Sequence, residues 1–232
     1  MLILFAPSKT FHRDAVKKPL KLFDELLTQS IINEIKSLSK SQFQKAFQLS
    51  SNLLETAYDY YHSFDDNAPL QSFSLFKGEA YKSLDYMSLN EIEKSYIHRH
   101  VYVIDALYGI IRPQDGIKPY RLDFHIDSKY KNIWKHKVNQ YLKSLNQEVL
   151  SLTSREFDNL IDANTVPFYE LSFIDCKEGV CKRISVLNKQ LRGKLLRYLA
   201  SHQIHKVSDL PEQFEGYRKF VHGYHVDYKK NE

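Results

Sequence analysis

Segments with helical periodicity and short apolar runs follow each other along this chain without a regular alternation of strand and helix. Residues 2–6 form a continuous apolar run that ends at Pro7, which predicts a buried strand leading into a loop. Apolar residues recur at helical spacing over residues 21–38, which predicts an amphipathic helix. We find no repeat, linker or low-complexity segment. We therefore expect one compact α+β domain over residues 1–232, with a mixed sheet and packed helices, rather than a doubly wound sheet.

Further elements are predicted by the same patterns and by capping and turn residues. Ser88 with Glu91, and Thr153 with Glu156, have the spacing of a capping box that opens a helix. A turn containing Gly179 separates two runs that predict a β-hairpin. The predicted strands are 72–76, 101–104, 149–152, 168–175, 180–187 and 217–228. The predicted helices are 41–61, one that opens at the Ser88 cap and ends near His98, 133–145, 188–201 and a short one opening at Asp209.

Basic residues are clustered more strongly than the net charge of +5 suggests. Seven lie between Glu178 and Asp209 without any acidic residue, and a second acid-free run over residues 129–143 holds five Lys. A clustered positive potential attracts phosphates. Each run taken alone is equally typical of a solvated helix face.

The chain contains two cysteines, Cys176 and Cys181, on either side of a tight turn. It has no apolar segment long enough to span a membrane and no signal-peptide pattern at its start. We therefore expect a cytoplasmic protein with reduced thiols and no membrane partner, with a contact between the two cysteines across a hairpin as the less favoured alternative. The spacing of the ten His predicts no metal site, and no motif indicates a cofactor.

The first candidate for a binding site is the loop Ser8-Lys9-Thr10, directly after the predicted first strand. Such a loop offers backbone N–H groups and short hydroxyls, and Lys9 adds a positive charge. This combination suits a phosphate or a carboxylate. The loop is no Walker motif, and an ordinary polar turn is the alternative.

The second candidate is Arg112 with Arg121, since both lie beside prolines that stiffen the backbone. Guanidinium groups held in place in this way are suited to bidentate recognition of phosphate. Tyr120 lies between the second Pro and Arg121. The equally favoured alternative is that each Arg forms a salt bridge with a nearby carboxylate, from Asp105, Asp115 or Asp123.

The third candidate is the predicted helix near Lys189. On a helical projection Arg192 falls inside the apolar arc, with Lys189 at its border. A charge on a buried face must be paired, so Arg192 either meets a buried carboxylate or faces a polar cleft. We favour the cleft because acidic residues are missing nearby in the sequence. Gly193 would let a backbone or a ligand approach closely.

The fourth candidate is Lys77-Gly78-Glu79, which follows a predicted strand. Charged residues on both sides of a Gly at a strand end are typical of a site, and equally of a turn. Glu79 and Glu156 could act as acid or base. A helix cap fully accounts for Glu156 as well.

Taken in order, these loops resemble the YaaA family of peroxide-stress-resistance proteins. The similar motifs are LILFAPSKT, FKGEAY, LYGIIRPQD with KPYRLD, SLTSREF and KQLRG, which span most of the chain and include Tyr108, Gly109 and Ser154. The resemblance implies a compact α+β fold with a positively charged cleft and a helix-hairpin-helix-like element near residues 96–121. It also implies binding to duplex or branched DNA and a role in limiting damage by hydrogen peroxide and free iron.

Two functional hypotheses follow, and both expect distant loops to converge on one anion-binding hollow. In the first, the chain is a DNA-binding stress protein that contacts the backbone without sequence specificity. In the second, it is an enzyme that acts on a small nucleotide or phosphosugar in a pocket too narrow for a duplex. A purely structural interaction module is the third, least favoured reading. The side chains expected to converge are Lys9, Arg112, Arg121, Lys189 and Arg192.

Overall fold

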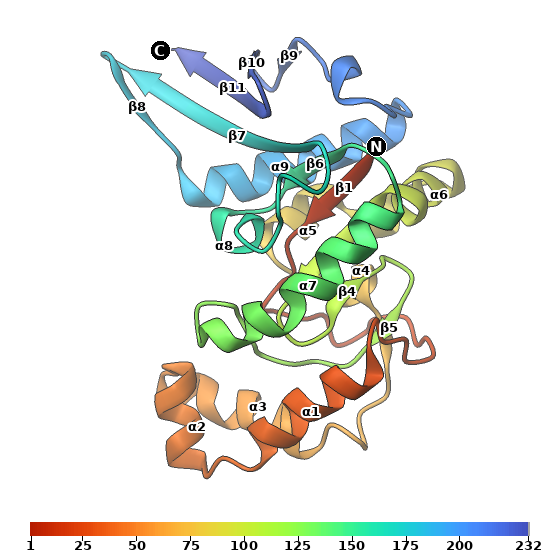
Figure 1. Ribbon diagram of the computed structural model, residues 1–232, viewed down its shortest axis with the longest axis vertical. Coiled ribbons are helices and arrows are strands. Elements are labelled where there is room, and N and C mark those ends of the chain that lie inside the picture. The colour runs from red at the N-terminus through yellow and green to blue at the C-terminus, as the bar shows by residue number, and fades with distance from the viewer. Residues whose placement is uncertain (232) are drawn as a thin grey trace.

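Five parallel strands form the centre of a nine-stranded sheet in the computed structural model, which describes residues 1–231 (Figure 1). These strands are β1 (Leu2–Phe5), β3 (Val101–Asp105), β6 (Val149–Leu152), β7 (Phe168–Lys177) and β11 (His225–Asn231). β1 pairs with β3 on one side and with β6 on the other, and β7 joins β6 to β11. β1, β3 and β6 are buried along their whole length, as expected for apolar strands covered on both faces.

Antiparallel strands complete the sheet and make it mixed. They are β4 (Gly109–Ile111) beside β3, β8 (Val180–Lys182) beside β7, and β10 (Tyr217–His222) with β9 (Gln213–Phe214) beyond β11. A separate two-stranded sheet joins β2 (Leu70–Gln71) to β5 (Gly116–Ile117). The expected single compact α+β fold with a mixed sheet is confirmed, although the parallel order of its five central strands was not anticipated.

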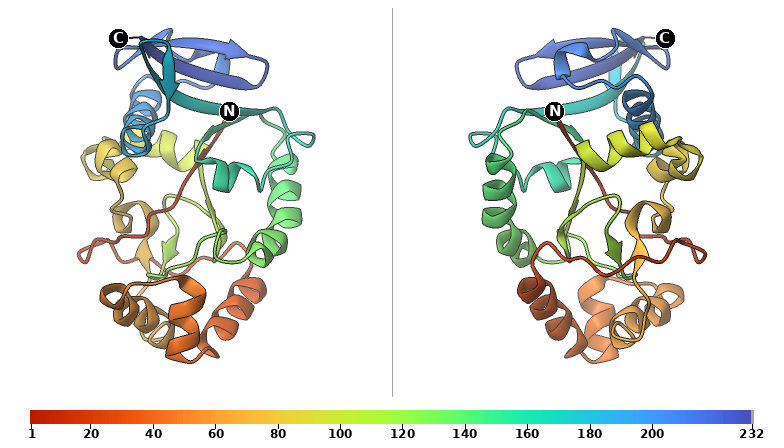
Figure 2. Two further views of the ribbon diagram at one scale, coloured as in Figure 1. Left: turned by 90° about the vertical axis from the view of Figure 1, so that its left-hand side faces the viewer. Right: turned by 90° about the vertical axis from the view of Figure 1, so that its right-hand side faces the viewer.

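Helices cover both faces of the sheet, with α7 on one face and α5, α6 and α9 on the other (Figure 2). The first three helices form a cap at the end of the molecule opposite the C-terminal strands (Figure 1). The described helices are α1 (Glu25–Lys36), α2 (Lys40–Phe47), α3 (Ser51–His62), α4 (Ser72–Leu75), α5 (Glu79–Leu84), α6 (Glu91–His100), α7 (Ser128–Ser144), α8 (Arg155–Asp158) and α9 (Ser185–Ser201), with 3₁₀ turns η1 (Tyr86–Ser88) and η2 (Val207–Asp209).

The prediction of a strand at residues 72–76 is wrong, because this segment forms the helical turn α4. Its serines are buried and bond to backbone: the Ser72 hydroxyl donates to the Arg112 carbonyl at 2.7 Å, and that of Ser74 to the Gln71 carbonyl at 2.9 Å. A short segment of this kind is compatible with a strand or a buried helix. Here hydrogen bonds to the rest of the protein favour the helical turn.

Other predicted limits also need correction. The helix predicted over 133–145 begins at Ser128, and the strand predicted over 217–228 is two strands, β10 and β11. The helix at residues 41–61 is two helices, because Gln48 ends α2 in the left-handed region with φ of 50°. In place of the helix predicted after Asp209, η2 ends at that residue and β9 follows. α9 begins at Ser185, so the second strand of the predicted hairpin is shorter than expected.

Neither predicted capping box forms. α6 is capped by Asn90 and Glu93, whose side chains bond each other's backbone N–H at 3.0 and 2.8 Å. At α8 the cap residue Ser154 makes no side-chain cap bond, while the Thr153 hydroxyl donates to the Asp158 carboxylate at 2.6 Å. At α6 a neighbouring pair takes the capping role, whereas at α8 no described side chain caps the helix.

Cys176 and Cys181 are joined by a disulfide across the β7–β8 hairpin, with their Cα atoms 4.0 Å apart. The expectation of reduced thiols is therefore contradicted, and the less favoured cross-strand contact is present. The two residues lie directly opposite each other in the strand register, which is why the turn brings them together. No helix among the described residues is long and apolar enough to cross a membrane.

Candidate functional site

The strand order reverses between β1 and β6, and this is where the loops of the first candidate site lie. From β1 the chain crosses to β3 on one side, whereas β6 later adds to the other side of β1. Both strands are parallel, so their carboxyl ends open onto the same crevice. In sheets of this kind, ligands bind outside the carboxyl ends of the strands at such a reversal.

A cavity of about 460 Å³ occupies this crevice. Its size falls within the range of pockets that hold a small ligand. Five basic and three acidic side chains line it, together with hydroxyls from the loops after β1 and β6. Eight of the residues expected to bind a ligand meet here, together with the acid or base candidates Glu79 and Glu156. The eight are Ser8, Lys9, Thr10, Lys77, Gly78, Ser154, Lys189 and Arg192.

The loop after β1 is fastened to the segment before α5. The Lys77 N–H donates to the Thr10 carbonyl at 2.9 Å, and the Ser8 hydroxyl donates to the same carbonyl at 3.0 Å. A Cβ on Gly78 would lie 2.8 Å from the Ser8 Oγ, so a larger residue there would displace the Ser8 hydroxyl. The Ser8 hydroxyl therefore serves mainly to shape the loop, as the polar-turn alternative expected.

Lys9 is paired within the cavity. Its ammonium lies 2.6 Å from the carboxylate of Asp123, whose side chain is only 5% exposed. Sequence reasoning assigned Asp123 as a partner of Arg112 or Arg121 rather than of Lys9. The pairing connects two loops that are more than a hundred residues apart, which no local motif reveals.

Three side chains around the Lys9–Asp123 pair could hold a metal ion. Asp123, His125 and Glu156 each present a ligand atom, and these atoms lie within 4.8 Å of one another. His125 Nδ1 already lies 3.3 Å from the Glu156 carboxylate, and Asp123 already binds Lys9. The trio combines a loop with α8, so its spacing in the sequence matches no metal motif.

Arg192 extends from α9 into the cavity wall and is largely buried. Its Nε is buried and has no hydrogen-bond partner among the described residues. Burial lowers the pKa of Arg192, and the Asp158 carboxylate partly offsets this. Asp158 itself accepts hydrogen bonds from the hydroxyls of Ser151 and Thr153, and its burial raises its pKa. Both sequence alternatives for Arg192 are thus present, a buried carboxylate and a polar cavity.

The other charges at the cavity differ in how they are paired. Glu79 binds Lys82 at 2.7 Å and the Gln190 amide at 3.0 Å, and these bonds lower the pKa of Glu79. Among the described residues, Lys77 and Lys189 make no ion pair within 4.0 Å. The cavity therefore combines cations without a close counter-charge and carboxylates that are already engaged.

Arg112 does not join this group, so the expected convergence fails for it. Its guanidinium lies over the ring of Tyr102, 3.8 Å from the centroid, and donates to the carbonyls of His98 and Arg99. It thereby satisfies the last turn of α6. Asp115 accepts from the Arg112 backbone N–H at 2.9 Å instead of pairing with its side chain.

The two tyrosines singled out in the sequence are buried in a cluster around Asp105. The Tyr120 hydroxyl donates to the Asp105 carboxylate, and the Tyr108 hydroxyl donates to the Lys118 carbonyl at 3.0 Å. Gly109 has φ of 71°, and a Cβ there would lie 2.5 Å from the Trp134 ring. These residues therefore build the core rather than the cavity wall.

Gly193 and Arg121 also lie outside the cavity lining. A Cβ on Gly193 would come within 2.0 Å of the Ala80 carbonyl oxygen, so this Gly allows α5 and α9 to pack closely rather than admitting a ligand. Arg121 is half-buried, and its backbone carbonyl accepts from the Tyr61 hydroxyl at 2.8 Å. Its side chain makes no ion pair with the residues described.

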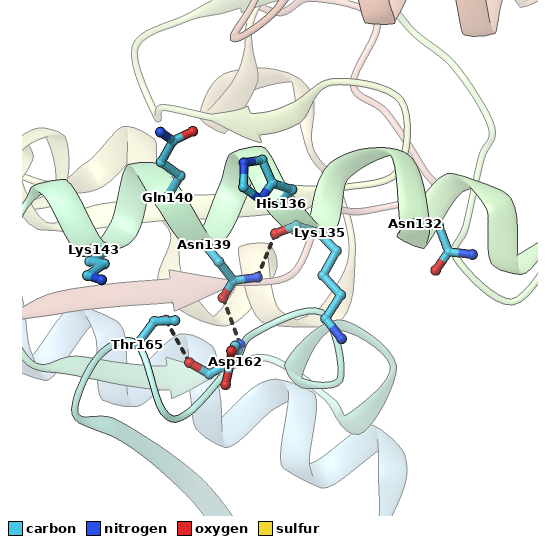
Figure 3. Close-up of a pocket in the computed structure, with 8 residues that line it drawn as sticks. All are labelled: Asn132, Lys135, His136, Asn139, Gln140, Lys143, Asp162 and Thr165. Carbon is cyan, nitrogen blue, oxygen red and sulfur yellow. Dashed lines mark hydrogen bonds between the residues drawn. The ribbon is translucent and has the colours of Figure 1, made fainter.

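Another cavity, of about 520 Å³, lies against α7 and the loop that follows α8 (Figure 3). Lys135 and Lys143 border it, but the side-chain amide of Asn139 is already hydrogen-bonded within the protein. The Asn139 amide donates to the carbonyls of Lys135 and Leu160 and accepts from the Asp162 N–H at 2.7 Å. No buried polar side-chain atom without a partner has been found in its lining over residues 1–230. This cavity is therefore the weaker candidate.

The fold and the cavity define an α+β protein with a mixed sheet and a ligand-sized crevice at a strand-order reversal. The sequence profile described as "Peroxide stress protein YaaA" matches residues 1–221. The chain belongs to this family.

Curated relatives carry the name UPF0246 protein. One from Fusobacterium nucleatum is 27% identical over 237 residues, covering 94% of this chain and 92% of the relative. One from Crocosphaera subtropica is 26% identical over 243 residues, covering 98% and 95%. One from Francisella tularensis is 28% identical over 231 residues, covering 90% and 91%. The similarity therefore extends over nearly the whole length of these proteins.

Proposed function

We propose that this chain acts in the response to peroxide stress by binding a phosphorylated, nucleotide-like group in the cavity beyond β1 and β6, with DNA as the source of that group. The single observation that carries the proposal is the Arg192 side chain, which lines the cavity and whose buried Nε has no partner among the described residues. A buried donor left unsatisfied costs about 1–3 kcal/mol, so a turn of the guanidinium that brings Nε to a phosphate oxygen in the cavity would be favoured.

Lys77 and Lys189, which line the cavity with Arg192, support the same proposal. Both lack a close counter-charge among the described residues. Phosphate contacts by Lys and Arg give binding that depends strongly on salt and little on sequence. The chain would therefore bind DNA without sequence specificity.

The cavity volume limits how DNA can enter. A space of about 460 Å³ suits one nucleotide-sized group and is far too small for a duplex. DNA would therefore present a single backbone phosphate or an unpaired nucleotide, as at a branch or a strand end. We expect branched DNA to bind more tightly than an intact duplex of equal length.

The resemblance also implied a helix-hairpin-helix-like contact with DNA near residues 96–121, but strands β3, β4 and β5 follow α6 there and the next helix begins only at Ser128. A DNA contact in this segment would therefore be made by its loops. Within that segment Arg112 and Tyr120 are engaged inside the protein. Arg121 is the expected contact residue there whose side chain makes no ion pair with the residues described. Arg121 is therefore the position at which this contact is tested.

A free nucleotide or phosphosugar is the second candidate ligand, in a chain that would act as an enzyme. The observation that favours it is that Glu79 and Glu156 line the same cavity as the unpaired cations. Carboxylates beside a bound phosphate could serve as acid or base. A thermal-shift panel of nucleotides and phosphosugars distinguishes this candidate from DNA, because a specific small ligand stabilises the folded state.

The test is a salt-titrated binding assay on junction, duplex and single-stranded DNA with matched variants. Lys189→Ala should weaken binding to all DNA about fivefold to tenfold and reduce the salt slope by about one. Lys206→Ala removes the same charge from an exposed position outside this cavity and should have little effect. Equal affinities for the wild type and the Lys189 variant at moderate salt would contradict the proposal.

A further inference from the structure

The disulfide between Cys176 and Cys181 lies in the β7–β8 hairpin, whose turn is exposed. Within residues 1–231, β8 pairs with β7 alone, through three residue pairs, and Cys176 opposite Cys181 is the middle one. The hairpin projects from one corner of the molecule, beyond the start of α9 (Figure 1). All the residues from Lys177 to Val186 are exposed. Oxidants and reductants therefore reach this pair without any opening of the core.

The strand register keeps the two sulfurs within bonding reach whether or not the bond is present. Cross-strand neighbours in an antiparallel pair have Cα atoms about 4.5–5.5 Å apart, and these two are 4.0 Å apart. No other cysteine occurs in the chain, so a thiol of this pair has one intramolecular partner. Such an arrangement favours a disulfide inside one chain over one between chains.

The two cysteines differ in their surroundings, which assigns them different roles. Cys181 is exposed and is followed by Lys182 and Arg183, whose charges favour the thiolate. Cys176 is half-buried and follows Asp175, whose carboxylate accepts from the Tyr217 hydroxyl at 2.8 Å. Asp175 faces Lys182 across the strand pair, so the difference between the two thiols is their burial, which disfavours a thiolate at Cys176. Cys181 is therefore the better nucleophile.

We propose that Cys181 and Cys176 form a reversible oxidation site for hydroperoxides, with Cys181 as the attacking and Cys176 as the resolving residue. The Cys181 thiolate attacks one peroxide oxygen, the O–O bond breaks, and the other oxygen leaves as water or an alcohol after taking up a proton. The sulfenic acid on Cys181 is then attacked by Cys176, which forms the S–S bond and releases water. Two thiols and one hydroperoxide thus give one disulfide, and a dithiol reductant reverses the change by exchange.

This inference goes beyond the DNA-binding proposal and does not depend on it. The family description names peroxide stress, which supplies the chemical class of the oxidant. The reaction needs no ligand in the cavity near Arg192. The test measures thiol oxidation. The oxidation proposal can therefore fail while DNA binding is confirmed, and DNA binding can fail while thiol oxidation is confirmed.

The test starts from reduced, desalted protein treated with one equivalent of hydrogen peroxide. Free thiols are titrated over time and the intact mass is measured. We expect both thiols to disappear together, with a mass loss of two hydrogen atoms and no covalent dimer. Separate oxidation of each thiol to higher acids, an interchain disulfide, or a rate no greater than that of free cysteine would overturn the proposal.

Single variants assign the roles, with dimedone as the trap for sulfenic acid. Cys176→Ser should accumulate a dimedone adduct on Cys181, whereas Cys181→Ser should give little adduct on Cys176 in the same time. The double change Lys182→Ala and Arg183→Ala should slow wild-type oxidation about threefold, because the thiolate loses its cationic neighbours. Lys206→Ala should leave the rate unchanged. Equal trapping in the two single variants would contradict the assignment of roles.

Discussion

The ammonium of Lys9 lies 2.6 Å from the carboxylate of Asp123, which ties the loop after β1 to the loop before α7. The carboxylate is almost fully buried, whereas the lysine is about half exposed. The pair closes one wall of the cavity and neutralises a charge that would otherwise repel phosphate. Its removal should therefore affect both stability and binding.

Lys9→Ala should lower the free energy of unfolding by about 1–2 kcal/mol, because Asp123 would be left buried without its partner. Urea unfolding measures the change. A double variant that adds Asp123→Asn should recover part of the loss, since no unpaired charge remains. Strictly additive effects of the two substitutions would show that the pair does not interact.

Asp105 predicts a specific pH dependence of stability. Burial raises its pKa from 3.8 to about 6, despite hydrogen bonds from Tyr120 and the backbone that favour the charged form. The folded state therefore holds this proton more tightly than the unfolded state does. The contribution of Asp105 is greatest below about pH 4 and is lost as the pH rises through about 6, a change of about 2–3 kcal/mol.

Asp105→Asn should remove that dependence while keeping the turn intact. An amide oxygen can still accept from the N–H groups of Leu107 and Tyr108, which bond the carboxylate at 2.8 and 2.9 Å. The measurement is the unfolding free energy of both proteins from pH 4 to 7, taken as a difference so that histidine titrations cancel. Parallel curves across that range would contradict the raised pKa.

Gly193→Ala should destabilise the fold severely, by about 3 kcal/mol or more, because its Cβ would overlap the Ala80 carbonyl and separate α5 from α9. Gly179→Ala is the matched control, since no atom lies within 4 Å of a Cβ there. Its positive φ of 78° should cost only about 1 kcal/mol. Thermal unfolding compares the two, and similar losses would argue against the close helix packing.

Arg112→Lys should reduce stability by about 1–2 kcal/mol without changing DNA affinity. A lysine cannot both lie flat on Tyr102 and donate to the two carbonyls at the end of α6. Urea unfolding and the salt-titrated assay are run on the same preparation. A clear loss of affinity in a stably folded variant would restore Arg112 to the binding surface.

The sequence correctly predicted elements whose hydrophobic pattern agrees with their burial. Its predictions failed where contacts between residues far apart in the chain determine the local structure. β1 and β6 are uninterrupted apolar runs, and their burial follows from that pattern alone. The segment 72–76 is as apolar as a strand, but the carbonyl of Arg112 holds Ser72 in a helical turn. No rule based on neighbouring residues predicts that hydrogen bond.

The residues of the candidate site were likewise predictable only in part. Arg192 could be found because an Arg inside an apolar arc must have a polar environment. Asp158 could not, since its approach to Arg192 depends on β6 and α8 meeting α9. Arg112 was misplaced because neighbouring prolines restrict the backbone without fixing the direction of a side chain. Gly193 marked a close approach correctly, but the approaching group is helix α5.

The central claim is that phosphate binds where Arg192 has its free donor, and a crystal structure with a short branched or single-stranded oligonucleotide tests it most directly. The account predicts a phosphate oxygen within hydrogen-bond distance of Arg192 Nε, with Lys77 and Lys189 turned toward it. A nucleic acid seated instead on α7 near Lys135 and Lys143, with the Arg192 cavity empty, would contradict it.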